Sequence, residues 1–238
     1  MKKKLNILGI ILARGGSKGL PNKNIKSFCD RPLLSWTISQ ALKSNAFKDV
    51  VVSTDSVEIS KISSKYGAYV PYLRPKELAT DDSPSIDSII HAIDFLSNKG
   101  KQYDAVCLLE PTSPMRRAEQ ISLIIEDYEK KFPNFTSVIT VGKVRESLDL
   151  FKTLDGDRLL PHNTSDHSQA RRQDLEDYYF PYGVAYIADT KSLLKERTFY
   201  TSKCSFYKLE SNQCFEIDNQ TDFDINELMF KKYYYNDQ

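Results

Sequence analysis

The sequence predicts an α/β fold, in which a mostly parallel sheet carries helices on both faces. Short apolar runs rich in β-branched residues alternate with segments of helical period, which is typical of such sheets. The 238 residues, 40% of them hydrophobic, are enough to bury one full core. We therefore expect a single domain over residues 1–238, with an inserted arm at about 142–179.

The individual elements follow from the same alternation. The apolar runs predict strands at Leu5–Leu12, Val50–Ser53, Tyr69–Tyr72, Ala105–Leu109, Ser137–Val141 and Gly183–Ile187. The segments of helical period predict helices at Leu33–Ser44, Val57–Tyr66, Ser85–Ser97, Ala118–Lys130, Lys191–Lys195 and Asp222–Tyr233. Ser56 and Glu58 support the start of the second helix, as a cap and a first-turn acid.

The alternation stops after Val141. The segment from Gly142 to Tyr179 is polar and rich in Asp, Arg and His, and a turn is expected at Asp155-Gly156. We therefore expect an excursion from the main sheet, in the form of a β-ribbon or an oligomerisation arm.

Charge and cysteine content restrict the class of protein. The 33 basic residues almost balance the 32 acidic ones, so no global field favours a nucleic acid or a membrane surface as partner. The cysteines have no metal-site or disulfide spacing, which indicates free thiols and a cytoplasmic protein. They are Cys29, Cys107, Cys204 and Cys214. The apolar run Leu5–Ala13 lies between Lys4 and Arg14 and fits a buried strand better than a signal peptide.

The segment most informative about chemistry is ARGGSKGLPNKN, between the first strand and the first long helix. Its three glycines permit close backbone approach and positive φ, while Arg14, Lys18 and Lys23 supply cations at the carboxyl end of a strand. These features predict a polyphosphate cradle, with a solvated glycine-rich turn as the alternative. The segment lacks the GK[ST] ending of a Walker A loop and the spacing of GxGxxG, so a dinucleotide-dependent oxidoreductase is disfavoured.

The same segment resembles the signature of the acylneuraminate cytidylyltransferases, the enzymes that make CMP-sialic acid and related CMP-nonulosonates. Four further segments resemble that family in the same order, namely Val52–Asp55, Leu73–Ala79, Pro111–Arg116 and Glu216–Asp218. The resemblance extends from about Ile7 to Asp222. It implies a Rossmann-like nucleotidyltransferase sheet, CTP and a nonulosonic acid as substrates, Mg²⁺ as cofactor and a homodimer.

The resemblance also implies roles for residues that would bind the nucleotide. In the loop these are Ala13, Arg14, Gly15, Gly16, Ser17, Lys18, Lys23 and Asn24. Arg14 and Lys23 would act as catalytic groups that face the reacting phosphate. Arg74, Ser83 and Ser85 match positions that contact the cytidine nucleotide in the family. On the residues alone, Arg74 lies in a polar turn and Ser85 is an ordinary helix cap.

Glu216 and Asp218 are the candidate metal ligands. On the strand expected there, both carboxylates would lie on the same face, on either side of Ile217. Mg²⁺ commonly takes one or two protein carboxylates and completes its shell with phosphate and water. The matching family pair binds the metal, with Asp common at the position of Glu216, whereas a solvated strand edge is the alternative reading.

The acceptor site is expected at Glu110, Arg171 and Tyr186. Glu110 follows a strand at the edge where ligands of open α/β sheets bind, and it stands where sialic acid enzymes often carry Gln. Arg171 matches an arginine that reaches a substrate carboxylate, often across a dimer interface, with a surface arginine as the alternative. Phe180 and Tyr182 replace the usual Arg and Asn of the family and leave the identity of the sugar open.

The reaction that these residues imply is attack of the anomeric 2-hydroxyl of a nonulosonic acid on the α-phosphorus of CTP, with release of pyrophosphate. Two alternatives stay open on the sequence. One is activation of another 2-keto sugar acid, such as an octulosonic acid. The other is a homologue that binds nucleotide or sugar without turnover.

Overall fold

A six-stranded sheet forms the centre of the computed structural model, which describes residues 4–162 and 176–234, apart from the side chain of Asp149. Its strands are β1 (Ile7–Leu12), β4 (Asp49–Ser53), β5 (Ala105–Leu108), β6 (Ser137–Lys143), β9 (Tyr179–Asp189) and β10 (Cys204–Lys208). Their order is β10-β6-β9-β5-β1-β4. Only β9 runs antiparallel to its neighbours, β5 and β6. The predicted α/β fold with a mostly parallel sheet is confirmed.

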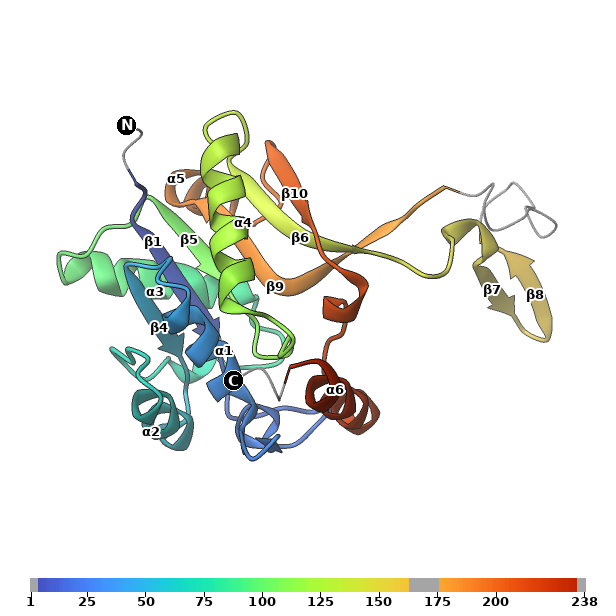
Figure 1. Cartoon of the computed structure of the whole chain (residues 1–238), viewed down its shortest axis with the longest axis horizontal. Coiled ribbons are helices and arrows are strands. Elements are labelled where there is room, and N and C mark those ends of the chain that lie inside the picture. The colour runs from blue at the N-terminus through green and yellow to red at the C-terminus, as the bar shows by residue number, and fades with distance from the viewer. Residues whose placement is uncertain (1–3, 163–175, 235–238) are drawn as a thin grey trace.

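Helices cover both faces of the sheet, as predicted (Figure 1). They are α1 (Leu33–Lys43), α2 (Val57–Lys65), α3 (Ser85–Asn98), α4 (Ala118–Lys131), α5 (Thr190–Glu196) and α6 (Gln220–Tyr233). Successive strand residues point to opposite faces, so Ile7 packs with α1, α2 and α4 while Leu8 packs with α3 and α5. Among the helices in the described part of the chain, none combines the length and apolar character needed to cross a lipid bilayer.

A third apolar cluster attaches α6 to the start of α1. Phe28, on the small hairpin of β2 (Ser27–Phe28) and β3 (Arg31–Pro32), contacts Phe223 and Phe230 edge to face, with both centroid distances 5.3 Å. Ile217, which precedes α6, is fully buried in the same cluster. The packing of α6 therefore fixes the position of the segment that contains the candidate metal ligands.

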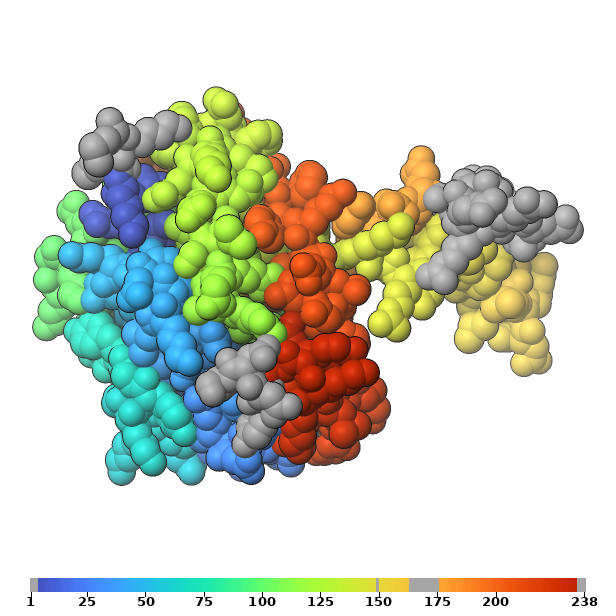
Figure 2. Space-filling view, in the orientation of Figure 1, coloured from blue at the N-terminus to red at the C-terminus, as the bar shows by residue number. Residues whose placement is uncertain are grey.

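The polar excursion forms a two-stranded antiparallel ribbon of β7 (Lys152–Asp155) and β8 (Arg158–Pro161). Gly156 adopts a positive φ of 56° in the turn, at the place where the sequence predicts one. The ribbon projects from the body of the molecule (Figures 1 and 2). Leu154 and Leu159 on it are exposed, although a role in dimerisation stays a prediction.

One predicted strand is wrong and other elements were not expected. Tyr69–Tyr72 makes only isolated bridges to the sheet, one at Tyr69 and one beyond the segment at Leu73. Pro71 has no N–H to donate, which prevents a continuous ladder. The hairpin β2–β3 and the edge strand β10 were not expected, and β9 is longer than the predicted Gly183–Ile187.

Candidate active site

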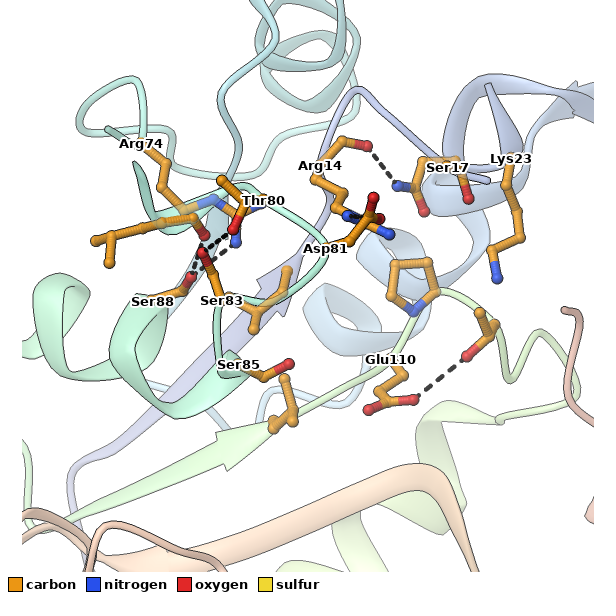
Figure 3. Close-up of a pocket in the computed structure, with 16 residues that line it drawn as sticks. Arg14, Ser17, Lys23, Arg74, Thr80, Asp81, Ser83, Ser85, Ser88 and Glu110 are labelled. Carbon is orange, nitrogen blue, oxygen red and sulfur yellow. Dashed lines mark hydrogen bonds and ion pairs between the residues drawn. The ribbon is translucent and has the colours of Figure 1, made fainter. Parts of the chain in front are cut away.

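A cavity of about 290 Å³ opens at the carboxyl ends of β1 and β5, where open α/β sheets bind ligands (Figure 3). The phosphate loop, residues 13–24, forms one wall, and the segment between β4 and α3 forms the opposite wall. The predicted site residues that line it are Arg14, Ser17, Lys23, Asn24, Arg74, Ser83, Ser85 and Glu110. Gly16 and Lys18 line an adjoining hollow together with Arg14 and Ser17. The structure therefore brings most of the predicted nucleotide residues together.

The phosphate loop is fixed by hydrogen bonds at its start and its end. The buried Ala13 donates its N–H to the carbonyl oxygen of Ser53 at 3.0 Å. Gly15 donates its N–H to Asp55 Oδ1 at 2.9 Å, and Asn24 Nδ2 donates to the carbonyl oxygen of Arg14 at 3.1 Å. Contacts within the chain therefore hold the loop conformation without a ligand. Asp55 is a positioning residue whose role the sequence alone did not indicate.

The glycines of the loop act through close approach rather than through positive φ. Gly15, Gly16 and Gly19 have no positive φ, and Asn22 takes the left-handed conformation instead, at a φ of 55°. A Cβ at Gly19 would lie 2.4 Å from the carbonyl oxygen of Asp218. The loop glycines thus do not use the positive φ that glycine permits, whereas at Gly19 the loop lies too close to Asp218 for a side chain.

Lys23 connects the phosphate loop to that acidic segment. Its Nζ donates to the carbonyl oxygen of Ile217 at 2.6 Å and to Asp218 Oδ1 at 3.3 Å. Only 13% of the Lys23 side chain is exposed, so its charge faces the cavity and these acceptors rather than bulk water. The phosphate loop and the segment Glu216–Asp218, on which the predicted chemistry depends, therefore adjoin each other.

The segment Glu216–Asp218 is not the strand that the sequence analysis expected. Residues 214–217 have no regular structure, and Asn219 caps α6 in a capping box with Asp222. The Asp222 carboxylate accepts the N–H of Asp218 at 3.0 Å. Hydrogen bonds of the helix cap therefore take the place of a β-ladder here. The prediction that a strand places the Glu216 and Asp218 carboxylates on one face is wrong.

The donor set at Glu216 and Asp218 nevertheless suits a hard divalent cation such as Mg²⁺. Glu216 Oε1 accepts hydrogen bonds from the Gly183 N–H at 2.6 Å and from Ser113 Oγ at 3.3 Å, while 78% of the Asp218 side chain is exposed. Burial raises the pKa of Glu216, and Asp218 adds to this effect. Within residues 4–162 and 176–234, no three or more His, Cys, Asp or Glu side chains are arranged so that they could hold a metal ion together. Two carboxylates leave the remaining positions to phosphate and water.

Arg74 is a buried cation that is only partly satisfied. Arg74 is 6% exposed, and its Nη1 donates to Ser88 Oγ at 2.9 Å. Its Nε and Nη2 have no hydrogen-bond partner among the residues that the structure describes. Its backbone N–H is held by the carbonyl oxygen of Thr54 at 2.7 Å. Burial lowers the pKa of Arg74, with Asp55 opposing the shift. Unpaired buried donors on a cavity wall suit a ligand that offers acceptor atoms.

Ser83 and Ser85 lie beside Arg74 on the same wall. Ser83 Oγ donates to the carbonyl oxygen of Glu77 at 2.6 Å and lies 2.5 Å from Thr80 Oγ1, which holds the connecting loop together. Ser85 is the first residue of α3, whereas Pro84 takes the cap position. The plain reading of Ser85 as a helix cap was therefore wrong.

Glu110 lies at the base of the cavity and is supported by a buried arginine. Arg116 is almost fully buried and donates to the carbonyl oxygens of Glu110 at 2.9 Å, Gly183 at 2.6 Å and Val184 at 2.6 Å. Burial lowers the pKa of Arg116 to about 10. Burial also raises the pKa of Glu110, and the Glu216 carboxylate raises it further. Arg116 thus joins the end of β5 to β9 beneath the cavity.

The remaining predicted acceptor residues are not gathered in this cavity. Tyr186 lies on β9 and is not among the residues that line the cavity. Burial raises the pKa of Tyr186, and the charge of Glu110 raises it further. Tyr200, which was not predicted, lies next to Tyr186, with the two ring centroids 6.4 Å apart. Phe180 is exposed on β9 and contacts Tyr182 edge to face at 5.3 Å. Arg171 lies outside the described residues.

Asp81 is the main cavity residue that the sequence analysis missed. Its carboxylate forms ion pairs with Arg14 Nη1 at 2.5 Å and with Lys18 Nζ at 2.6 Å. An acidic residue gives no signal for an anion site when read alone. Its position between the matched segments Leu73–Ala79 and Pro111–Arg116 was the only available indication.

Comparison with known proteins supports the class of enzyme that the sequence predicts. The family model for cytidylyltransferases matches residues 8–238. The chain is 34% identical over 219 residues to an N-acylneuraminate cytidylyltransferase of Escherichia coli, covering 92% of this chain and 51% of that protein. It is 31% identical over 225 residues to a pseudaminic acid cytidylyltransferase of Campylobacter jejuni, with 94% and 96% covered.

A third relative is the CMP-N,N'-diacetyllegionaminic acid synthase of Legionella pneumophila, 33% identical over 236 residues, with 95% of this chain and 97% of the relative covered. The chain therefore spans about half the length of the Escherichia coli relative and nearly all of the other two. Among solved structures, a CMP:2-keto-3-deoxy-manno-octonic acid synthetase complexed with CTP superposes with a TM-score of 0.71 at 14% identity, covering 95% of this chain and 99% of that one. That likeness shows the shared fold. On its sequence and its fold, the chain belongs to the cytidylyltransferase family.

Proposed function

We propose that this cytidylyltransferase transfers CMP from CTP to the anomeric 2-hydroxyl of a nonulosonic acid and releases pyrophosphate. The observation that carries the proposal is the single cavity in which the phosphate loop, the buried Arg74 and Glu110 meet, with Lys23 linking it to Glu216–Asp218. Relatives that are named for sialic, pseudaminic and legionaminic acids support the class of acceptor.

The distribution of charge suggests how the nucleotide lies. Nε and Nη2 of Arg74 are donors on the wall opposite the phosphate loop, and they suit the acceptor atoms of a pyrimidine base or ribose. Arg14 and Lys23 lie on the phosphate loop and suit the triphosphate. The cytidine would therefore extend toward α3, and its phosphates toward the loop and the acidic segment.

In the reaction, the anomeric hydroxyl oxygen forms a bond to the α-phosphorus and gives up its proton to water, while the bond from this phosphorus to the pyrophosphate oxygen breaks. Negative charge develops on the phosphoryl oxygens and on the leaving group. Arg14 and Lys23 stabilise that charge from fixed positions, because Asn24 holds the Arg14 carbonyl and Ile217 and Asp218 hold Lys23. No covalent intermediate with the protein is needed.

Glu216 and Asp218 would hold the Mg²⁺ ion. When bound there, the ion supplies Lewis-acid stabilisation of phosphate charge and lowers the pKa of the attacking hydroxyl. The hydrogen bonds from Gly183 and Ser113 orient Glu216 for this role.

The acceptor would lie against Glu110 and Tyr186, with Arg171 binding its carboxylate. Burial raises the pKa of Glu110, so its charge is less favoured than that of an exposed carboxyl. Its carboxyl oxygens can accept hydrogen bonds from hydroxyl or acylamino groups of the acceptor.

We also propose that the chain is one catalytic domain that works in the cytoplasm as a homodimer. The projecting ribbon carries exposed Leu154 and Leu159, which a second copy could bury. All four cysteines are free thiols, which suits a reducing compartment. Sedimentation at several protein concentrations tests the dimer, and a monomer at every concentration would contradict it.

The decisive test is a pyrophosphate-release screen with CTP and Mg²⁺ against sialic, legionaminic, pseudaminic and deaminated nonulosonic acids. We expect CTP-dependent release with at least one of these acids and much slower release with an octulosonic acid. Protein that binds CTP tightly but releases no pyrophosphate with any acid would contradict the proposal. Loss of turnover in both Glu216→Ala and Asp218→Ala, with the fold retained, would support the metal assignment.

A further inference from the structure

The phosphate loop already has an anionic partner within the chain. The Asp81 carboxylate lies between Arg14 and Lys18, at 2.5 Å and 2.6 Å from their nitrogens. Figure 3 shows Asp81 beside the Arg14 side chain, between the wall that carries Arg74 and the wall that carries Lys23. One carboxylate therefore takes hydrogen bonds from two of the three cations of the loop.

This arrangement matters because a phosphate oxygen needs the same donors. Hydrogen bonds from Lys18 and Arg14 hold the pKa of Asp81 below its ordinary range, so its carboxylate stays ionised at neutral pH. Arg14 and Lys18 together carry a charge of +2, and the Asp81 carboxylate reduces the sum to +1. Any polyphosphate that engages Arg14 and Lys18 must displace this carboxylate or accept its repulsion.

Asp81 is also suited to displacement. It lies on the connection between Leu78 and α3, whose internal bonds run from Ser83 to Glu77 and Thr80 and do not involve the Asp81 side chain. The Asp81 side chain is 34% exposed and that of Lys18 is 81% exposed. Ion pairs this exposed are weak, so a triphosphate with several charges can replace them.

We propose that Asp81 competes with the phosphates of the nucleotide for Arg14 and Lys18, and so limits the affinity of the site for CTP and for pyrophosphate. This inference rests on the proposed function. It makes Asp81 a residue that tunes affinity, because its return to the two cations favours departure of the leaving pyrophosphate.

The test compares Asp81→Asn with Asp82→Asn by calorimetric titration of CTP, inorganic pyrophosphate and cytidine in the presence of Mg²⁺. Asp82 is the matched control, because it has the same charge one position away and no ion pair within the described residues. We expect Asp81→Asn to tighten CTP and pyrophosphate about fivefold, with cytidine unchanged. Asp82→Asn should change all three by less than twofold.

The sign of the effect separates this competition from a purely structural role. If Asp81 only holds Arg14 and Lys18 in place, the Asn variant will bind CTP and pyrophosphate more weakly. Weaker or unchanged binding, or equal tightening in both variants, overturns the inference. Asp81→Ser provides a second test if the Asn variant has a lowered melting temperature.

Failure of this inference can be told from failure of the proposed function. Wild-type protein that turns over CTP, together with an Asp81→Asn variant that gains no affinity, refutes only the competition. Wild-type protein that neither binds nor turns over CTP refutes the proposed function, and with it the inference.

Discussion

The nucleotide side and the acceptor side of the molecule are built differently. On the nucleotide side, Arg14, Lys23 and Arg74 line one cavity. Each of these residues makes a hydrogen bond to another residue of the chain, which fixes its position. On the acceptor side, Glu110 shares that cavity, whereas Tyr186 lies on β9 outside its lining. The long strand β9 then continues toward the projecting ribbon.

This difference indicates that one chain alone forms most of the nucleotide side of the site. Recognition of a polyphosphate needs donors at the carboxyl ends of neighbouring strands, and in the proposed function the connection after β1 supplies them. In the proposed function, recognition of the sugar acid depends on Tyr186 of β9 and on Arg171 of the excursion. Substitutions on the nucleotide side should therefore change the chemical step or CTP binding, while those on the acceptor side should leave CTP binding intact.

The largest effect is expected from Lys23→Ala. Lys23 is mostly buried, and in the proposed reaction it stabilises the developing phosphate charge, so kcat should fall by about 10²- to 10³-fold. Lys18→Ala is the matched control, because it removes the same charge from an exposed position and should cost less than about tenfold. Pyrophosphate release at saturating substrates measures both variants. Equal losses would mean that overall charge, and not the position of Lys23, supports turnover.

A large loss of stability is expected from Arg116→Met. The carbonyl oxygens of Glu110, Gly183 and Val184 would lose buried charged donors, so the free energy of unfolding should fall by about 3 kcal/mol. Arg117→Met, at the neighbouring and less buried position, should cost under about 1 kcal/mol. Urea titration followed by circular dichroism distinguishes them. A small effect at Arg116 would show that the two sides are not joined through this residue.

A smaller effect, confined to nucleotide binding, is expected from Arg74→Met. The two unpartnered nitrogens would no longer meet the cytidine, so the KM for CTP should rise about tenfold. The KM for the acceptor should change by less than twofold. Ser88→Ala is a useful control, since it removes the existing partner of Arg74 Nη1 and a hydrogen bond to the Leu78 carbonyl oxygen but leaves the guanidinium in place. Parallel increases in both KM values would contradict the separation of the two sides.

The smallest effect is expected from Glu110→Gln, measured without metal. Burial raises the pKa of Glu110 in the folded protein, so the folded state binds this proton more tightly than the unfolded chain does. The associated stability is present below the ordinary pKa and is lost as pH rises through the raised pKa. The variant avoids that loss, and its melting temperature at pH 7.5 should be higher by about 2–4 °C, or ~1 kcal/mol.

The advantage of Glu110→Gln should shrink as the pH is lowered toward 4. Glu126→Gln, at an exposed position on α4, should show no such trend. A melting temperature that rises equally at all pH values would indicate a packing effect and not the titration of Glu110.

Regular elements were predictable where a single local signal decided them. The Ser56 cap of α2 was confirmed, with its side chain accepting the Ile59 N–H at 3.3 Å. Predictions failed where a second local preference won, as at Pro71, which interrupts a strand, and at Asn219, which caps α6. The edge strand β10 was missed because its sequence, CSFYK, is short and mixed in polarity.

The predicted nucleotide residues gathered because they lie on the connections that follow β1 and β4, and a parallel sheet brings the carboxyl ends of these strands to one edge. The ion pairs of Asp81 could not be predicted, because they depend on how the connection after Leu78 folds across the phosphate loop. The role of Arg116 could not be predicted either, since nothing in the sequence distinguishes it from the less buried Arg117.

The bond between Lys23 and Asp218 joins residues that are 195 positions apart. This half of the site therefore exists only while α6 is docked on the cluster around Phe28 and Ile217. A ligand that spans the phosphate loop and the acidic segment favours the docked form by mass action. Amide hydrogen exchange within α6 should consequently slow when nucleotide and metal bind, although none of the proposed ligand-binding residues belongs to that helix.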